Sequence, residues 1–343
     1  MRSGINFGML LRVMGLLVII EAAFMAVPLV TSLVYGDGDT MAFVVSILVA
    51  ASVGALMTFG VRPGRRDMGK REGFLLTASV WVFFSVFGMI PFLICRTPLT
   101  LSDAFFEAMS GFTTTGASVM QEIDGLSHAI HMWRSLMQWI GGMGIILFTL
   151  AVVPMLNSAG GMQMFNAEVT GITHEKLRPR VSSTAKRLWL VYALLTIALI
   201  LLYWIGPMGM FDSICHAFST MSTGGFSTRQ ESIGAWDSLY VKIVSTLFMF
   251  IGGVNFALIF KASSGRFADV WRNQTFRAYL VVILLMFLLF DLALAFNHKV
   301  PDTVEAYTID PLFQIVSTMT STGYTVSNFE SWGVFILALE FIM

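Results

Sequence analysis

Three short segments rich in threonine and glycine contain the residue types that could bind a dehydrated cation. They read TTTGAS at 113–118, STGGFS at 222–227 and TSTGYT at 320–325. An extended backbone can present carbonyl oxygens that replace the water shell of an ion, and glycine permits the backbone angles that this requires. Threonine and serine hydroxyls can supply further acceptors or hold the loop from behind. Taken singly, each segment is better explained as a turn or a close helix contact.

The three segments align with one another without a gap. The longer sequences are AMSGFTTTGAS at 108–118, AFSTMSTGGFS at 217–227 and IVSTMTSTGYT at 315–325. They share a serine (Ser110, Ser219, Ser317) and, six positions later, a glycine (Gly116, Gly225, Gly323). Recurrence at intervals of about 100 residues indicates an internal repeat. Repetition at equal offsets favours an ion path over three unrelated turns.

The composition is that of a membrane protein. Of the 343 residues, 56% are hydrophobic and 12% are charged, whereas a soluble domain carries about 25% charged residues. A water-soluble enzyme is therefore excluded. The net charge of zero gives no indication of a nucleic-acid partner, and the two cysteines, Cys95 and Cys215, are too few for a disulfide framework or a metal cluster.

Apolar segments long enough to cross a bilayer position the three loops. A spanning helix needs roughly 20 apolar residues, and the segments that qualify are 8–34, 41–61, 73–95, 133–156, 188–206, 240–260 and 278–296. Shorter apolar pieces at 102–115, 211–222 and 309–320 are predicted to enter the membrane and return to the same side. The final apolar run, from Trp332 to Met343, is too short to span.

Charge distribution predicts the orientation. Loops 62–72, 157–187 and 261–277 each hold four or five Lys and Arg residues, which places them and the N-terminus in the cytoplasm. The opposite side is acidic and would concentrate cations. Four acids expected at the starts of the short helices are candidates for an outer vestibule: Asp103, Glu107, Asp212 and Asp310. Ordinary exposed charge explains them equally well.

Basic residues and glycines also occur in the second helix of a repeat. Arg134 and Lys242 each lie near the start of such a helix. Extension of the side chain to the membrane interface is the commoner explanation, and an electrostatic barrier beside a pore is the alternative. Close helix packing, rather than hinge motion, is the favoured explanation for the glycines Gly141, Gly142, Gly144, Gly252 and Gly253.

The motifs TTTGAS, STGGFS and TSTGYT together resemble those of the Trk/Ktr/HKT superfamily of potassium and sodium uptake proteins, specifically the TrkH type. The resemblance implies an all-α polytopic membrane protein with membrane–pore–membrane repeats around one central pore, preceded by an N-terminal transmembrane hairpin. The expected domains are the hairpin with its basic loop (1–72), the first pore repeat (73–187), the second (188–277) and an incomplete third (278–343). Because the resemblance also implies a fourth repeat, we expect a truncated sequence or a chain completed by a partner.

The function that this resemblance implies is potassium uptake across the cytoplasmic (inner) membrane of a bacterium. The predicted selectivity filter comprises Thr113, Thr114, Thr115, Gly116 and Ala117; Ser222, Thr223, Gly224, Gly225 and Phe226; and Thr320, Ser321, Thr322, Gly323 and Tyr324. Glycine rather than serine at 116 is associated with potassium preference. Alternatives are a sodium or non-selective transporter of the same superfamily, a non-conducting membrane subunit, and a membrane-embedded enzyme, for which the loops lack a paired His or Lys.

The expected partners also follow from the resemblance. It implies a homodimer and a cytoplasmic nucleotide-binding regulatory subunit of the TrkA type. We expect no cofactor, no nucleic-acid partner, and no metal other than potassium, which binds at the filter as the transported substrate.

Overall fold

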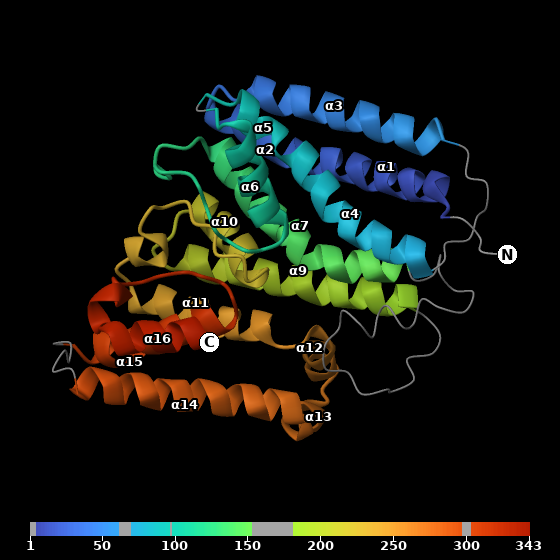
Figure 1. Cartoon of the computed structure of the whole chain (residues 1–343). Helices are drawn as coiled ribbons and strands as arrows, with labels where there is room; N and C mark the ends of the chain where they lie inside the picture. The colour runs from blue at the N-terminus through green and yellow to red at the C-terminus, as the bar shows by residue number, and fades with distance from the viewer. Residues whose placement is uncertain (1–4, 62–69, 97, 153–180, 297–302) are drawn as a thin grey trace. The chain divides into compact units, whose positions relative to one another are not determined.

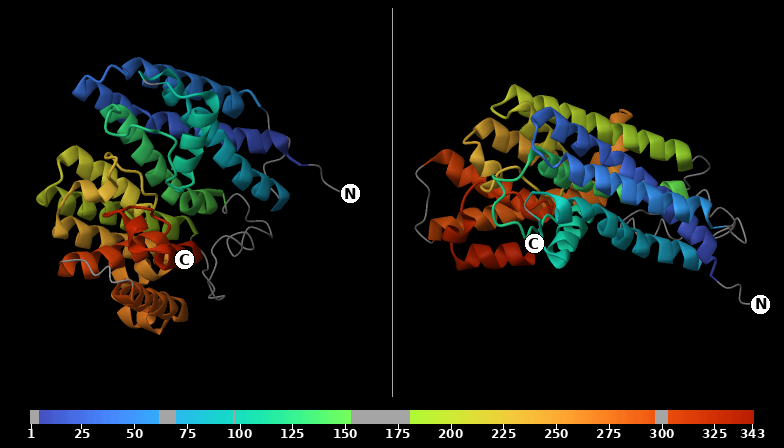
Figure 2. Two further views of the ribbon diagram at one scale, coloured as in Figure 1. Left: turned by 60° about the vertical axis from the view of Figure 1, so that its left-hand side comes forward. Right: turned by 90° about the horizontal axis from the view of Figure 1, so that it is seen from above.

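The computed structural model describes residues 5–61, 70–96, 98–152, 181–296 and 303–343. Within these residues the regular structure is entirely helical (Figures 1 and 2). The helices are α1 (Phe7–Phe24), α2 (Ala26–Tyr35), α3 (Thr40–Phe59), α4 (Lys70–Gly88), α5 (Ile90–Ile94), α6 (Leu101–Phe112), α7 (His128–Val152), α9 (Val181–Ile205), α10 (Met210–Met221), η1 (Ser232–Ala235), α11 (Leu239–Gly253), α12 (Phe256–Ser263), α13 (Phe267–Arg272), α14 (Gln274–Phe296), α15 (Val304–Met319), η2 (Phe329–Trp332) and α16 (Val334–Ile342). The predicted all-α fold class is confirmed.

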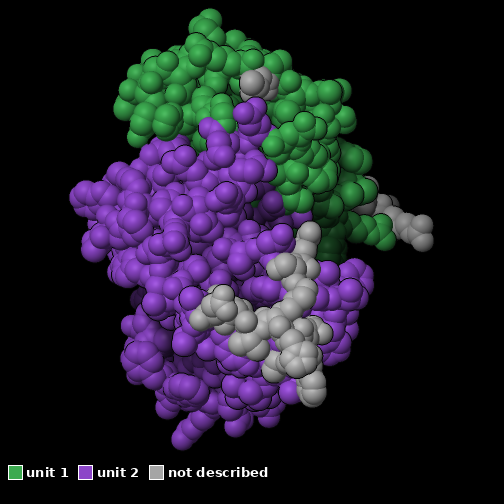
Figure 3. All heavy atoms as spheres, turned by 90° about the vertical axis from the view of Figure 1, so that its left-hand side faces the viewer, with its two compact units in different colours: residues 1–113, 117–121, 125–186 green, residues 114–116, 122–124, 187–343 purple. Residues whose placement is uncertain are grey.

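The chain forms two compact units (Figure 3). Unit 1 comprises residues 1–113, 117–121 and 125–186, and unit 2 comprises residues 114–116, 122–124 and 187–343. The centre of the first Thr/Gly loop thus belongs to unit 2, together with the second and third loops. The predicted hairpin and first repeat share unit 1, so their boundary at 72 stays a prediction.

Five helical stretches among the described residues are long and apolar enough to cross a membrane: Phe7–Tyr35, Thr40–Phe59, Arg71–Ile94, Lys186–Ile205 and Gln274–Leu294. Their outward faces are apolar. On α3, for example, Phe59 is 77% exposed and Leu56 is 70% exposed, while Phe43 and Ala50 are buried. Such a surface is unfavourable in water but suits hydrocarbon, where the helix satisfies its own backbone hydrogen bonds. The protein is therefore a multi-pass membrane protein.

One of the predicted spans differs from the structure. The segment 8–34 matches the candidate span Phe7–Tyr35, within which α1 and α2 meet at Met25. The segment 240–260 is not one helix, because α11 ends at Gly253 and Val254 has extended backbone angles before α12 begins at Phe256. Gly252, Gly253 and the polar Asn255 mark this break in the sequence, but the segment as a whole is still apolar, so hydropathy does not reveal it. The end of the predicted span 133–156 lies outside the described residues.

Close backbone packing and a half-buried acid hold parts of unit 1 together. A Cβ atom added to Gly15 of α1 would lie 2.6 Å from the Gly54 carbonyl oxygen of α3, so the two helices pack with their backbones in close approach. The Asp37 carboxylate accepts hydrogen bonds from the Ala129 N–H and from the His128 ring, both at 3.0 Å. These contacts connect the loop between α2 and α3 to the start of α7.

The three predicted short helices are confirmed as α6, α10 and α15. The first two have 12 residues each and α15 has 16. At about 1.5 Å per residue, 12 residues reach roughly 18 Å, well short of a hydrocarbon core of about 30 Å. Each is followed directly by a Thr/Gly loop.

Candidate ion-binding site

All three Thr/Gly loops adopt the same unusual backbone. In each loop the shared glycine and the residue two positions before it have positive φ: 54° and 77° at Thr114 and Gly116, 52° and 79° at Thr223 and Gly225, and 57° and 79° at Ser321 and Gly323. The residue between them does not. In an ordinary strand successive carbonyls point to opposite sides, whereas alternation in the sign of φ turns successive carbonyls toward one side. Positive φ is uncommon for threonine and serine, so its recurrence at the same position of three loops is a specific backbone conformation shared by the repeats.

The loops converge within unit 2. A Cβ atom added to Gly116 would collide with the Gly224 carbonyl oxygen and would lie 3.6 Å from the Thr322 carbonyl oxygen. A Cβ atom added to Gly225 would collide with the Thr322 carbonyl oxygen. Carbonyl oxygens from different repeats therefore lie beside the glycines of their neighbours. Glycine is needed at 116 and 225 for close approach as well as for its backbone angles.

The first residue of each loop uses its hydroxyl to close the preceding helix. Thr113, Ser222 and Thr320 donate to the carbonyl oxygens of Met109, Phe218 and Val316 at 2.7, 2.8 and 2.8 Å. Each bond reaches back four residues, to a carbonyl oxygen that also accepts the backbone N–H of the same loop residue, so two hydrogen bonds join each loop to the last turn of its helix. These hydroxyls hold the loops from behind, and backbone carbonyls are left as the converging oxygens.

The serines shared by the repeats fasten the far ends of two loops. Ser110 Oγ donates to the Ala117 carbonyl oxygen at 2.6 Å, and Ser317 Oγ donates to the Tyr324 carbonyl oxygen at 2.8 Å. These two carbonyls are directed at their own pore helices. Ala117 and Tyr324, though predicted as filter residues, thus lie where the loops are anchored.

Aromatic side chains support the loops of unit 2 from behind. The Tyr203 hydroxyl of α9 lies 2.8 Å from Ser245 Oγ and 3.2 Å from Thr220 Oγ1. The Tyr324 side chain is fully buried, and its hydroxyl lies 3.4 Å from the carbonyl oxygens of His216 and Phe226. Phe226, the last predicted filter residue of the second loop, is buried as well.

Two of the four candidate vestibule acids lie in the first turn of a pore helix, as predicted. The Asp103 carboxylate accepts a 2.6 Å hydrogen bond from the Thr100 hydroxyl at the start of α6. Asp212 accepts a 2.7 Å hydrogen bond from the Thr228 hydroxyl and lies 3.5 Å from the Arg229 guanidinium. A carboxylate is favourable at a helix N-terminus.

For Glu107 and Asp310, the predicted position at a helix start is wrong. Both lie inside their helices, are buried, and form ion pairs with the two basic residues of the second helices. Glu107 Oε1 lies 2.8 Å from Arg134 Nε, and Asp310 Oδ1 lies 2.8 Å from Lys242 Nζ. Extension of Arg134 and Lys242 to the membrane interface is therefore also wrong, because the side chains turn into the protein. Sequence reasoning missed the pairing, although charges in apolar helices were a signal for it.

Close packing explains Gly141, Gly252 and Gly253 in the second helices, whereas a Cβ atom added to Gly144 would meet only Trp81, at 3.9 Å. A Cβ atom added to Gly141 would collide with the Phe112 carbonyl oxygen at the end of α6. One added to Gly252 would lie 3.0 Å from Thr223 Cγ2, and one added to Gly253 would lie 2.7 Å from Thr320 Cγ2. The second helices thus pack directly against the loops and the ends of the pore helices.

The chain is similar to known cation transport proteins. The TrkH family model, described as a cation transport protein, matches residues 39–343. The Trk system potassium uptake protein TrkH of Salmonella typhimurium is 39% identical over 337 residues, which are 97% of this chain and 69% of that protein. TrkI of Halomonas elongata is 31% identical over 330 residues, which are 94% of this chain and 65% of that protein. The crystal structure of the potassium transporter TrkH from Vibrio parahaemolyticus matches with a TM-score of 0.87 and 35% identity, over 98% of this chain and 69% of that one. The chain belongs to the TrkH family of cation transport proteins.

Proposed function

We propose that this protein mediates potassium uptake across the cytoplasmic membrane of a bacterium. Potassium passes between backbone carbonyls of the segments 113–117, 222–226 and 320–324, in which the Ala117 and Tyr324 carbonyls anchor the loops and the carbonyls before them face the ion. The observation that carries the proposal is the repeated alternation of φ in three loops whose carbonyls and glycines meet in unit 2. Relatives named as potassium uptake proteins support the same ion.

Neutral carbonyls are suited to this task. A cation must lose water to enter a narrow path, and closely spaced carbonyl oxygens compensate for that loss. The three loops contain no charged residue at these positions, so the ion is bound weakly enough to leave again. The hydroxyl bonds to Met109, Phe218 and Val316 fix the loops without using the converging carbonyls.

The surroundings of the path have proposed roles as well. Asp103 and Asp212 attract cations toward the outer side, a contribution that salt weakens. The N-terminus and the basic loops face the cytoplasm. Loop 261–277 belongs to the described residues, whereas most of 62–72 and of 157–187 lies outside them. A second copy of the chain and a TrkA-type nucleotide-binding subunit are the proposed partners, and the domain limits at 72, 187 and 277 stay predictions.

The test is ion flux through the full-length protein in liposomes. Potassium efflux should depend on the protein, and competing sodium should reduce it far less than rubidium, an ion close to potassium in size. Equal sodium and potassium fluxes would favour the non-selective alternative. An absence of potassium flux from folded protein would contradict the proposal.

A further inference from the structure

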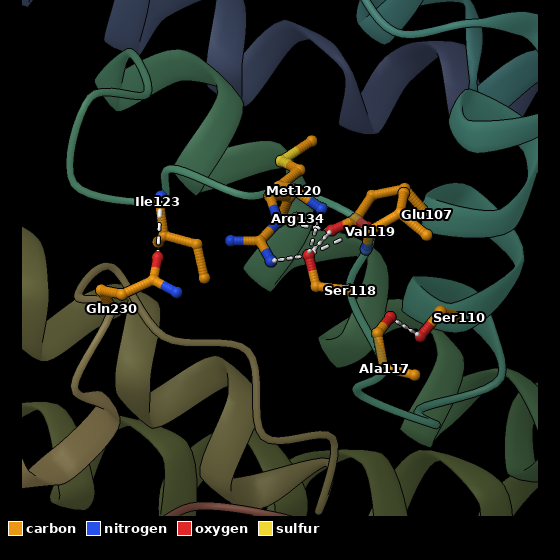
Figure 4. A network of polar contacts seen from close by, with 9 residues as sticks. All are labelled: Glu107, Ser110, Ala117, Ser118, Val119, Met120, Ile123, Arg134 and Gln230. Carbon is orange, nitrogen blue, oxygen red and sulfur yellow. Dashed lines mark hydrogen bonds and ion pairs between the residues drawn. The ribbon is translucent and has the colours of Figure 1, made fainter.

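A buried ion pair lies behind the outer end of the first loop (Figure 4). Glu107 projects from the pore helix α6 and Arg134 from the second helix α7, with 2.8 Å between Oε1 and Nε. The two side chains are 0% and 1% exposed. An ion pair removed from water this completely costs desolvation energy, which is recovered only when further hydrogen bonds complete it.

Those hydrogen bonds come from the residues that follow the loop. Ser118 Oγ lies 3.0 and 3.1 Å from the two Glu107 carboxylate oxygens, and the Val119 N–H donates to Glu107 Oε2 at 3.2 Å. Arg134 Nη2 donates to Ser118 Oγ at 3.2 Å. Figure 4 shows both charged side chains directed at this turn of the chain. Because Ser118 and Val119 directly follow Ala117, the ion pair fixes the end of the first loop.

The second repeat has a side-chain contact between the same two aligned positions, but other residue types form it. Glu107 stands three residues before Ser110, and His216 stands three residues before Ser219. Ser118 and Ser227 each follow their loop glycine by two residues, and His216 Nε2 lies 3.0 Å from Ser227 Oγ. Two repeats thus join the same pair of positions, which indicates a shared role.

The third repeat has a different arrangement at this register. The equivalent residues there are Gln314 and Thr325. The Thr325 N–H donates to Ser232 Oγ at 3.3 Å, so the turn η1 of the second repeat holds it. Among these three positions, only Glu107 carries a carboxylate bound to a basic side chain.

We propose that Glu107 and Arg134 form a positioning pair that fixes the outer end of the first loop and thereby sets the ion preference of the path. The proposal rests on the proposed function. A carboxylate accepts from the Ser118 hydroxyl, the Val119 N–H and Arg134 together. A glutamine at 107 has one oxygen for these three donors and adds an N–H₂ group that faces them. The chain after Ala117 would then lose its fastening, and the carbonyls covalently attached to it would lose their fixed positions.

The experiment measures the potassium-to-sodium flux ratio in liposomes containing the full-length protein. We expect Glu107→Gln to lower the ratio roughly tenfold, because the free energy of about one charge-assisted hydrogen bond corresponds to a factor of that size. Glu122→Gln is the matched control, because it removes the same charge from an exposed residue of the following segment. Its flux ratio should equal that of the wild type.

A second variant separates positioning from stability. In Glu107→Gln/Arg134→Met the unpaired buried charge is removed, so the melting temperature should recover relative to Glu107→Gln. The flux ratio should stay low, since the fastening of Ser118 and Val119 is still weakened. A purely structural role predicts that the ratio recovers together with the melting temperature, and that result would overturn the proposal.

Ser118→Ala gives a test that does not depend on the fold tolerating a change at Glu107. Ser118 is exposed and the ion pair stays in place, so the variant should fold and its flux ratio should fall. Wild-type ratios in folded Ser118→Ala and Glu107→Gln would refute the positioning role while potassium flux continued. Loss of the proposed function is distinguishable, because the wild type itself would then conduct no potassium.

Discussion

Alanine at the three loop glycines should impair potassium selectivity to unequal extents. All three glycines have φ between 77° and 79°, so an alanine at any of them is strained by its backbone. Their surroundings differ. An added Cβ atom collides with a neighbouring carbonyl oxygen at Gly116 and at Gly225, whereas no described atom lies within 4 Å of one at Gly323.

The difference can be expressed as energies. Left-handed backbone costs an L-residue about 1–2 kcal/mol, which is a factor of roughly 10 in the population of the native loop. Gly323→Ala carries this cost alone. At Gly116 and Gly225 the facing carbonyl oxygen must also move by roughly 1 Å. In enzymes, a displacement of that size in a catalytic group lowers the reaction rate about 100-fold, and we expect a comparable loss of selectivity here. Selectivity should therefore fall moderately in Gly323→Ala and severely in the other two variants.

The assay is the potassium-to-sodium flux ratio, measured beside the melting temperature of each variant. Gly265→Ala is the matched control: Gly265 has a φ of 78°, no described atom lies within 4 Å of an added Cβ atom, and it follows α12 away from the loops. It should lose a similar amount of stability and keep the wild-type ratio. Equal losses in all three loop variants would refute the contact argument, and unchanged ratios in all three would refute the filter assignment.

Two further predictions concern stability. Lys242→Met leaves the buried Asp310 without its ion-pair partner and should destabilise the protein by about 3 kcal/mol; adding Asp310→Asn should restore part of this, as a thermal-unfolding double-mutant cycle will measure. Gly141→Ala should lower the melting temperature by the equivalent of about 1–3 kcal/mol, because its Cβ atom meets the Phe112 carbonyl oxygen. Gly144→Ala, whose Cβ atom would meet only Trp81 at 3.9 Å, should be neutral or stabilising; equal losses at both positions would contradict this explanation.

Local features of the sequence were sufficient to predict the pore helices and their loops. The predicted piece 102–115 became α6 at Leu101–Phe112, and 211–222 became α10 at Met210–Met221. Length and apolarity are properties of a segment itself, so they can be recognised without knowledge of the fold. The alignment of Gly116, Gly225 and Gly323 likewise required only their equal distance from a shared serine in the sequence. All three glycines have positive φ in the structure.

Contacts between residues far apart in the sequence could not be predicted from such local features. For Arg134 and Lys242, extension to the membrane interface was favoured over an electrostatic barrier beside a pore, because no partner for either charge is close in the sequence. Their partners, Glu107 and Asp310, lie 27 and 68 residues away in the sequence. The end of α11 at Gly253 was missed for another reason, because Gly252, Gly253 and Asn255 interrupt a segment that is apolar as a whole. Pairing and backbone angles become visible only after the chain has folded.

The three loops share one backbone conformation but are held by different side chains. Alternating φ is the same in all three loops, so each contributes equivalent carbonyls. The groups that hold the residues after the glycines differ: a buried carboxylate at Glu107, an imidazole at His216, and a loop serine, Ser232, that receives the Thr325 N–H. In an assembly of identical subunits such groups change together, but a single chain can vary one fastening while leaving the others intact. Under the function and the positioning role proposed above, ion preference would thus be adjusted through one loop, without a change in the sequence of the loop itself.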